Sequence, residues 1–145
     1  MSVKTKLNSI VNNLHTLLQN KFSSIELVKG FKKDISTLPF ERIYIALISL
    51  DAKPLTVEQV MAYTVRIDLV YAYGINDASD SALETAQLHV WDVVGDILDL
   101  IHDNPTLNDA CRWCHATTVS FEPKFSEDIR TFASIITLEA EFDIE

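Results

Sequence analysis

Residues 61–73 read MAYTVRIDLVYAY, and they carry the clearest pattern in the sequence. Large apolar side chains occupy every second position, and smaller or polar side chains lie between them. Successive side chains of a strand point to opposite faces of the sheet, so a period of two predicts a long strand with one buried face. Turn residues in 74–77 end this strand. The residues expected on its buried face are Met61, Tyr63, Val65, Ile67, Leu69, Tyr71 and Tyr73.

The segments before this strand predict a helix and two further strands. Residues 4–21 carry apolar side chains three and four positions apart, which is typical of an amphipathic helix. Residues 25–29 predict a short strand that Gly30 ends. Residues 41–50, ERIYIALISL, are apolar on both faces, as expected for an interior strand, and 52–54 predict the turn that follows.

A second helix is expected over residues 79–103. Ser81 and Glu84 have the spacing of a capping box, and Asn104-Pro105 ends the helix. The apolar stripe expected to face the sheet comprises Leu83, Ala86, Val90, Val94, Ile97, Leu98 and Ile101. The opposite side carries Asp92, Asp96, Asp99 and Asp103. A row of carboxylates at helical spacing is most often a solvated face, so we do not expect it to bind a cation.

Two more strands follow, over residues 112–122 and in the C-terminal segment. In the latter, one face is expected to hold Phe132, Ser134, Ile136, Leu138, Ala140, Phe142 and Ile144. The sequence thus predicts a single α+β domain, residues 1–145, with the element order α-β-β-β-α-β-β. Two helices would pack on a largely antiparallel or mixed sheet of four to five strands.

The motif CRWCH at residues 111–115 has the spacing of a c-type haem attachment site. In a strand, however, Cys111 and Cys114 would point to opposite faces and could not clasp one haem or one metal. We therefore expect Trp113, His115, Val119 and Phe121 on one strand face, with Cys114 and Ala116 on the other. We expect no cofactor. A small metal- or haem-binding redox module that uses Cys111, Cys114 and His115 stays open as an alternative.

Other catalytic motifs are missing from the sequence. The only glycines are Gly30, Gly74 and Gly95, so no glycine-rich phosphate loop exists, and GxSxG is absent. The histidines are scattered, and the sequence brings no nucleophile, base and oxyanion donor together. We therefore expect no enzymatic activity.

Charge is distributed unevenly along the chain. The net charge is −9; residues 1–53 hold 8 Lys/Arg against 4 Asp/Glu, and residues 54–145 hold 4 against 17. A strongly acidic total disfavours nucleic-acid binding through phosphate contacts. A basic end and an acidic end would let copies stack by electrostatic complementarity, and an uneven but merely solvated surface is the alternative. The sequence shows neither a signal peptide nor a membrane-spanning segment, so we expect a soluble protein made in the cytosol.

Two charged features are candidate surfaces for assembly. Four carboxylates alternate along one face of the last strand, where they would keep a sheet edge wet or form an acidic wall when repeated around a ring. They are Glu139, Glu141, Asp143 and Glu145. A solvated strand end is the alternative. The basic loop after the first short strand carries Lys29, Lys32 and Lys33, and it is the second candidate interface.

Several segments together resemble the tail terminator (tail completion) proteins of long-tailed bacteriophages. They are the helix LNSIVNNLHTLLQNKF leading into IELVKG, the strands ERIYIALISL and VMAYTVRIDLVYAYG, the helix beginning DSALETAQLHVWDVVGDIL, and the closing pair CHATTVSFEP and RTFASIITLEAEFDI. The resemblance covers nearly the whole chain and rests on element order, length and strand patterning. Relatives can carry longer interface loops than the basic loop at residues 29–33.

The resemblance implies a structural virion protein that is assembled in the host cytoplasm. It implies a homo-oligomeric ring, usually of six subunits, at the head-proximal end of the tail tube. Such a ring stops tube polymerisation and offers a surface to head-completion or neck proteins, while DNA passes through without specific binding. A head-tail joining or neck protein is the alternative in the same class, and a cytosolic binding domain unrelated to phage is another.

Overall fold

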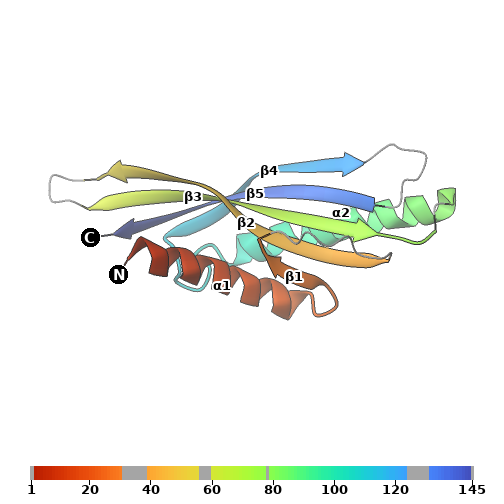
Figure 1. Ribbon diagram of the computed structural model, residues 1–145, viewed down its shortest axis with the longest axis horizontal. Helices are drawn as coiled ribbons and strands as arrows, with labels where there is room; N and C mark the ends of the chain where they lie inside the picture. The colour runs from red at the N-terminus through yellow and green to blue at the C-terminus, as the bar shows by residue number, and fades with distance from the viewer. Residues whose placement is uncertain (1, 31–38, 56–59, 78, 124–130, 145) are drawn as a thin grey trace.

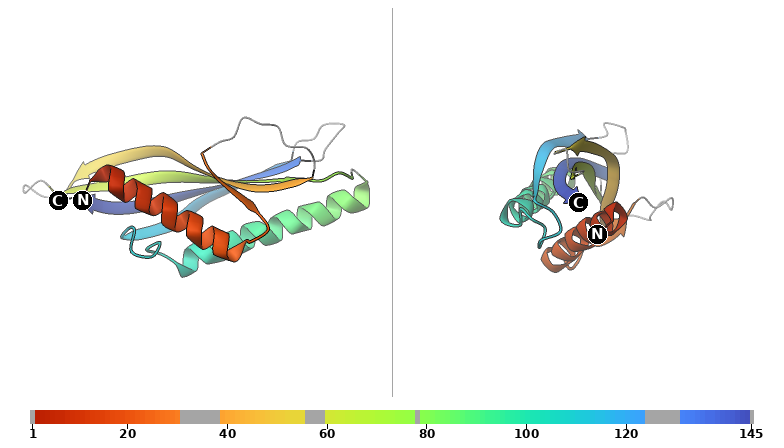
Figure 2. Two further views of the ribbon diagram at one scale, coloured as in Figure 1. Left: turned by 60° about the horizontal axis from the view of Figure 1, so that its bottom comes forward. Right: turned by 90° about the vertical axis from the view of Figure 1, so that its left-hand side faces the viewer.

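The computed structural model describes residues 2–30, 39–55, 60–77, 79–123 and 131–144. Its elements are α1 (Val3–Lys21), β1 (Glu26–Lys29), β2 (Phe40–Pro54), β3 (Met61–Gly74), α2 (Asp80–Asp103), β4 (Trp113–Pro123) and β5 (Thr131–Ile144). The predicted α+β class and the order α-β-β-β-α-β-β are confirmed. Figures 1 and 2 show an elongated, strongly twisted sheet with both helices on one of its faces, which we call the inner face.

The five strands form one mixed sheet in the order β1-β2-β3-β5-β4. Strand β1 runs parallel to β2, and every other neighbouring pair is antiparallel. The centre of the sheet is the β3–β5 ladder, which runs without interruption from Met61 opposite Ile144 to Gly74 opposite Thr131. Each of these two strands is paired on both edges and covered by helices on one face, which explains their clear period of two.

The hydrophobic core lies between the inner face and the helices. Helix α1 contributes Ile10, Leu14 and Leu18, and α2 contributes Ala86, Val90, Val93, Val94, Ile97 and Ile101. The alternating positions of β3 and β5 meet these stripes with Val65, Ile67, Leu69, Tyr71, Ile136, Leu138, Ala140 and Phe142. The periods of 3.6 and 2 read from the sequence therefore describe the two sides of one core.

The bounds of α2 agree with the prediction, but its N-terminal cap does not. Ser79 is the N-cap, and its side-chain oxygen accepts a hydrogen bond of 3.3 Å from the amide of Ala82. The predicted capping box of Ser81 and Glu84 is wrong, because the helix begins two residues earlier than that motif requires. The amide of Ser79 in turn donates to Asp77 Oδ1 at 2.9 Å, which fixes the entry into the helix.

Strand β2 is longer than predicted, and only its first half is interior. The predicted turn at 52–54 is wrong, because Lys53 and Pro54 continue the ladder opposite Ala62 and Met61. The amide of Leu55 donates to the carbonyl of Val60 at 2.9 Å. Every residue from Leu47 to Leu55 is exposed, since the β1 ladder ends at Ile45. The apolar composition of this strand therefore does not mean burial.

Strand β4 contains a bulge that changes the predicted faces. Ala116 pairs with Leu138, and the next pair is Thr118 with Thr137, so Thr117 is the extra residue. The bulge moves Val119 and Phe121 to the inner face, opposite Ile136 and Ser134. The prediction that they share a face with Trp113 and His115 is therefore wrong: they lie on the same side as Cys114 and Ala116.

Candidate functional site

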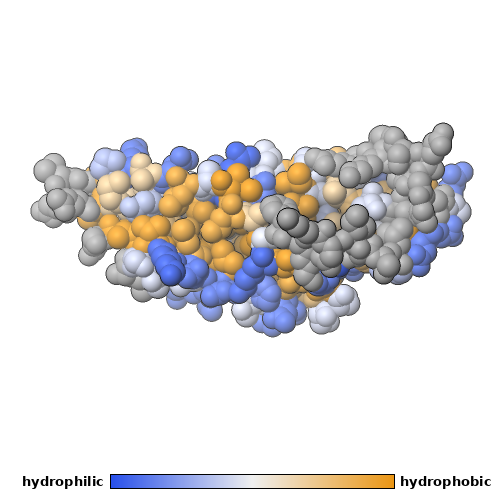
Figure 3. Space-filling view, in the orientation of Figure 1, coloured by the Kyte–Doolittle hydropathy of each residue, from blue (hydrophilic) through white to orange (hydrophobic). Residues whose placement is uncertain are grey.

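The most unusual surface is apolar and lies on β2. We call Leu47, Ile48, Leu50 and Leu55 the β2 apolar stretch; their side chains are between 39% and 49% exposed. Figure 3 shows hydrophobic residues gathered in a band directly above the position of α1 in Figure 1. Beyond Ile45, β2 has ladder partners on β3 alone among the described strands. An exposed strand edge with apolar side chains is a site where another chain can dock.

The predicted acidic residues of β5 lie together on the outer face. Glu139, Glu141 and Asp143 occupy alternate positions and are each partly exposed, while Glu145 is outside the described residues. Arg112, just before β4, bonds Glu141 Oε1 at 3.0 Å and Asp143 Oδ2 at 3.1 Å. In register, Glu139 is flanked by Arg66 on β3 and His115 on β4. The carboxylates therefore lie on a face of mixed charge.

The basic loop is described only at its start. Lys29 ends β1, and its Nζ donates a hydrogen bond of 2.6 Å to Asn12 Oδ1 on α1. Its register partner is Ile45, two residues before the β2 apolar stretch. Lys32 and Lys33 lie outside the described residues. Lys29 thus adds positive charge next to the apolar surface of β2.

The two cysteines of CRWCH both lie in the core. The prediction that they point to opposite faces is wrong, because β4 begins at Trp113 and Cys111 belongs to the preceding loop. Burial raises the pKa of the Cys111 thiol to about 11 and that of the Cys114 thiol to about 12. Both are free thiols, and His115 is exposed with its ring 4.8 Å from that of Trp113. Within the described ranges, no three His, Cys, Asp or Glu side chains gather as a metal site.

These buried thiols predict a loss of stability at alkaline pH. The folded chain keeps both protons above pH 9, whereas an unfolded thiol with an ordinary pKa of 9.0 releases its proton. The stability that the buried, protonated thiols contribute is fully present below pH 9. It falls as the pH rises towards the pKa values of the folded chain, about 11 and about 12. Urea unfolding at pH 8 and pH 10 measures this loss. The double variant Cys111→Ala/Cys114→Ala should lose less between the two pH values, and an equal loss would contradict the assignment.

A polar cluster that sequence reasoning missed joins three elements on the inner face. The hydroxyl of Tyr71, whose side chain is 0% exposed, donates to Glu41 Oε2. The same oxygen lies 2.7 Å from His89 Nε2 on α2, and the His89 ring lies 4.7 Å from the ring of Tyr73. Burial, reinforced by Glu41, raises the pKa of Tyr71 well above its ordinary value. The one sequence signal was a glutamate beside Arg42 at the start of a largely apolar strand.

Two of the cavities formed by the described residues border α2. The smaller, of about 50 Å³, lies between α2 and the ends of β4 and β5, with the exposed rings of Trp91 and Phe121 at its mouth. The larger, of about 570 Å³, is an open groove near the C-terminal end of α2. It is lined by Leu98, Ile101, His102, Pro105, Trp113, Cys114, His115 and Ala116. Three residues of CRWCH thus border the groove: Trp113, Cys114 and His115. The thiol of Cys114 is protonated there, and it is the thiolate that acts as nucleophile or metal ligand.

Comparison with known proteins gives no match from which a function could be inferred. No protein-family model matches the chain, and no curated protein matches it. None of the helices in the described part is long and apolar enough to cross a bilayer. The acidic residues of α2 that sequence reasoning considered for cation binding, Asp92, Asp96, Asp99 and Asp103, are all exposed to solvent. The β2 apolar stretch is therefore the surface on which a functional hypothesis can rest.

Proposed function

We propose that the protein is a phage tail terminator, a structural component of the virion. It forms a ring at the head-proximal end of the tail tube, where it stops tube polymerisation and provides the surface for head attachment. The β2 apolar stretch carries this proposal. A chain that exposes Leu47, Ile48 and Leu50 on an open strand edge would aggregate unless assembly covers them.

The charged face of β5 supports the same function. Glu139, Glu141 and Asp143 lie on the outer face, away from both helices. Arg112 is already paired with two of the carboxylates, so it does not offer its positive charge to DNA phosphates. Repeated around a ring, this face would therefore let DNA pass without holding it. The partners are then further copies of the chain, the tube protein and a neck protein. The location is the neck of the virion.

Tube capping tests the proposal. The purified chain is added to tail tubes grown from a tube protein of the same genome, and elongation is followed by light scattering. We expect elongation to stop, and negative-stain images to show a ring at one end of each tube. Tubes that keep growing with the chain in excess would contradict the function. Rings that bind no tube end but bind head-completion proteins would favour the neck alternative.

A further inference from the structure

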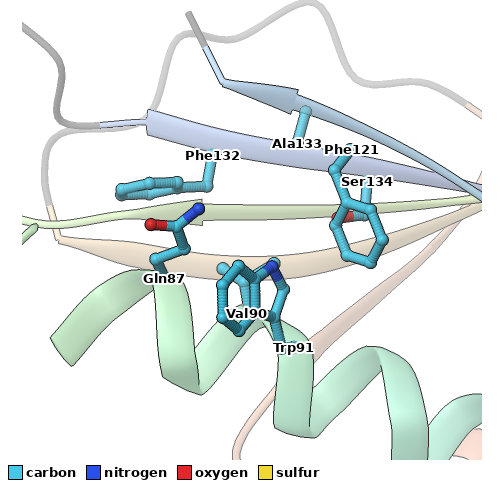
Figure 4. A pocket seen from close by; sticks show the side chains of 7 residues that line it. All are labelled: Gln87, Val90, Trp91, Phe121, Phe132, Ala133 and Ser134. Atoms are coloured by element: carbon cyan, nitrogen blue, oxygen red, sulfur yellow. The ribbon is translucent and has the colours of Figure 1, made fainter. Parts of the chain in front are cut away.

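A second apolar surface lies on the opposite side of the fold from β1 and the β2 edge. Leu88 and Trp91 on α2 and Phe121 on β4 are 52%, 48% and 47% exposed. We call the cleft between Trp91 and Phe121 the aromatic slot; Figure 4 shows the two rings at its mouth. Gln87, Val90 and Phe132 form its walls. Leu88 is not part of the lining, but the two large exposed rings of Trp91 and Phe121 at one concave site are characteristic of a docking pocket for an apolar side chain.

The floor of the aromatic slot contains a polar group without a partner. Ser134 lies on the inner face of β5, opposite Phe121, and its side chain is 0% exposed. Its Oγ has no hydrogen-bond partner within the described ranges. A buried hydroxyl without a partner is costly, so Ser134 adds a polar point to the floor of an otherwise apolar slot.

Charge tells the two apolar surfaces apart. Helix α1, which lies below the apolar band of Figure 3, contains Lys4, Lys6 and Lys21 and no acidic residue. Helix α2, which carries the aromatic slot, contains no Lys or Arg. Its six acidic residues are all exposed: Asp80, Glu84, Asp92, Asp96, Asp99 and Asp103. Within the span of the β2 apolar stretch, the exposed charges of Asp51 and Lys53 cancel. The lysines of α1 therefore leave this side positive and the carboxylates of α2 leave the other side negative, so each surface fits the other better than it fits itself.

We propose that the aromatic slot of one copy receives the β2 apolar stretch of a second copy. The contact is head to tail, because the two surfaces differ and lie on different elements. Such a heterologous contact leaves one unused surface at each end of a dimer and closes only in a ring. The inference rests on the proposed function for ring closure, and the pairing of slot and stretch can be tested without phage components.

Two single variants and their mixture form the test. Leu50→Glu damages the stretch, and Trp91→Glu damages the slot; each places a carboxylate at an exposed position. Analytical ultracentrifugation is expected to show assembly of the wild type and monomers of each variant, with the apparent dissociation constant raised about tenfold or more. An equal mixture of the two variants keeps one intact slot and one intact stretch, so it should form a dimer and stop there.

Matched controls separate docking from folding and from charge. Ser49→Glu adds a carboxylate to β2 on the outer face, and His102→Glu adds one to α2 away from the slot. Both should assemble like the wild type, and thermal melts of all four variants should stay close to the wild-type melt. Ser49→Glu or His102→Glu chains that fail to assemble would overturn the specificity of the pairing.

Each of the remaining outcomes also bears on the pairing of slot and stretch. A monomeric wild type, or a variant mixture without dimers, overturns the pairing of slot and stretch. Dimers of Trp91→Glu alone indicate stretch-to-stretch contact, and dimers of Leu50→Glu alone indicate slot-to-slot contact, and either overturns it. If Trp91→Glu assembles normally but no longer caps tubes, the occupant of the slot is the tube protein. Assembly as proposed together with failed tube capping would refute the tail terminator function alone.

Discussion

Phe142→Ala is expected to lower the free energy of unfolding by about 3–5 kcal/mol, the range for removing a large aromatic side chain from a core. Phe142 is 1% exposed and lies on the interior strand β5, where its ring stacks on Tyr63 at a centroid distance of 5.4 Å. A domain of this size is stable by about 5–15 kcal/mol, so the variant would lose a large fraction of its stability. Urea unfolding monitored by circular dichroism measures the loss.

Phe121→Ala is the matched control for this prediction. It removes the same side chain from an edge strand where 47% of the residue is exposed, so the loss should stay below about 1 kcal/mol. If the two alanine variants lose equal stability, the core assignment of β5 is contradicted. Phe121→Ala should nevertheless weaken self-association, because its ring forms one lip of the aromatic slot.

Glu41→Ala is expected to lower the free energy of unfolding by about 1–3 kcal/mol, because it leaves a buried donor without an acceptor. The hydroxyl of Tyr71 donates to this carboxylate, which also holds His89 and thereby ties α2 to β2 and β3. Glu41→Gln keeps an acceptor oxygen at the same position and should lose less. Denaturant unfolding at neutral pH compares the two variants.

A double-mutant cycle with Tyr71→Phe isolates this hydrogen bond. The Tyr71→Phe variant has no hydroxyl donor that could be left without an acceptor. Glu41→Ala should therefore lower the free energy of unfolding by about 1 kcal/mol less in the Tyr71→Phe background than in the wild type. Strictly additive losses would show that Glu41 does not act through Tyr71. If Glu41→Ala instead costs less stability in a His89→Ala background, the stabilisation comes from the link between α2 and the sheet.

The sequence predicts best those elements whose environment is uniform along their length. In β3 and β5, both edges are paired and one face is covered, so a period of two identifies the buried residues from Val65 to Tyr71 and from Phe132 to Phe142. Strand β2 changes environment at Leu47, where neither β1 nor a helix covers it, and composition alone gives no sign of that change. The bulge at Thr117 reverses the faces of β4 for the same reason: alternation carries no record of an extra residue.

The surface was predicted less completely than the core. The carboxylates Glu139, Glu141 and Asp143 are visible as alternating letters, but Arg112, which bonds two of them, comes from a loop whose position depends on the fold. Glu41, Tyr71 and His89 come from three elements, and no spacing in the chain relates them. The aromatic slot likewise needs the β4 bulge to bring Phe121 towards Trp91. Sites that several elements build together are readable only once those elements are placed.

The interior position of β5, between β3 and β4, has a consequence for how the chain folds. Strand β5 pairs with β3 on one edge and with β4 on the other, while α2 and β4 lie between β3 and β5 in sequence. The β2–β3 hairpin closes through a short connection and can form early, whereas the β3–β5 ladder requires the closure of a long loop and forms slowly. Until β5 is inserted, β3 and β4 both present open edges and apolar inner faces. Delay in that one late step therefore leaves the nascent chain most vulnerable to aggregation.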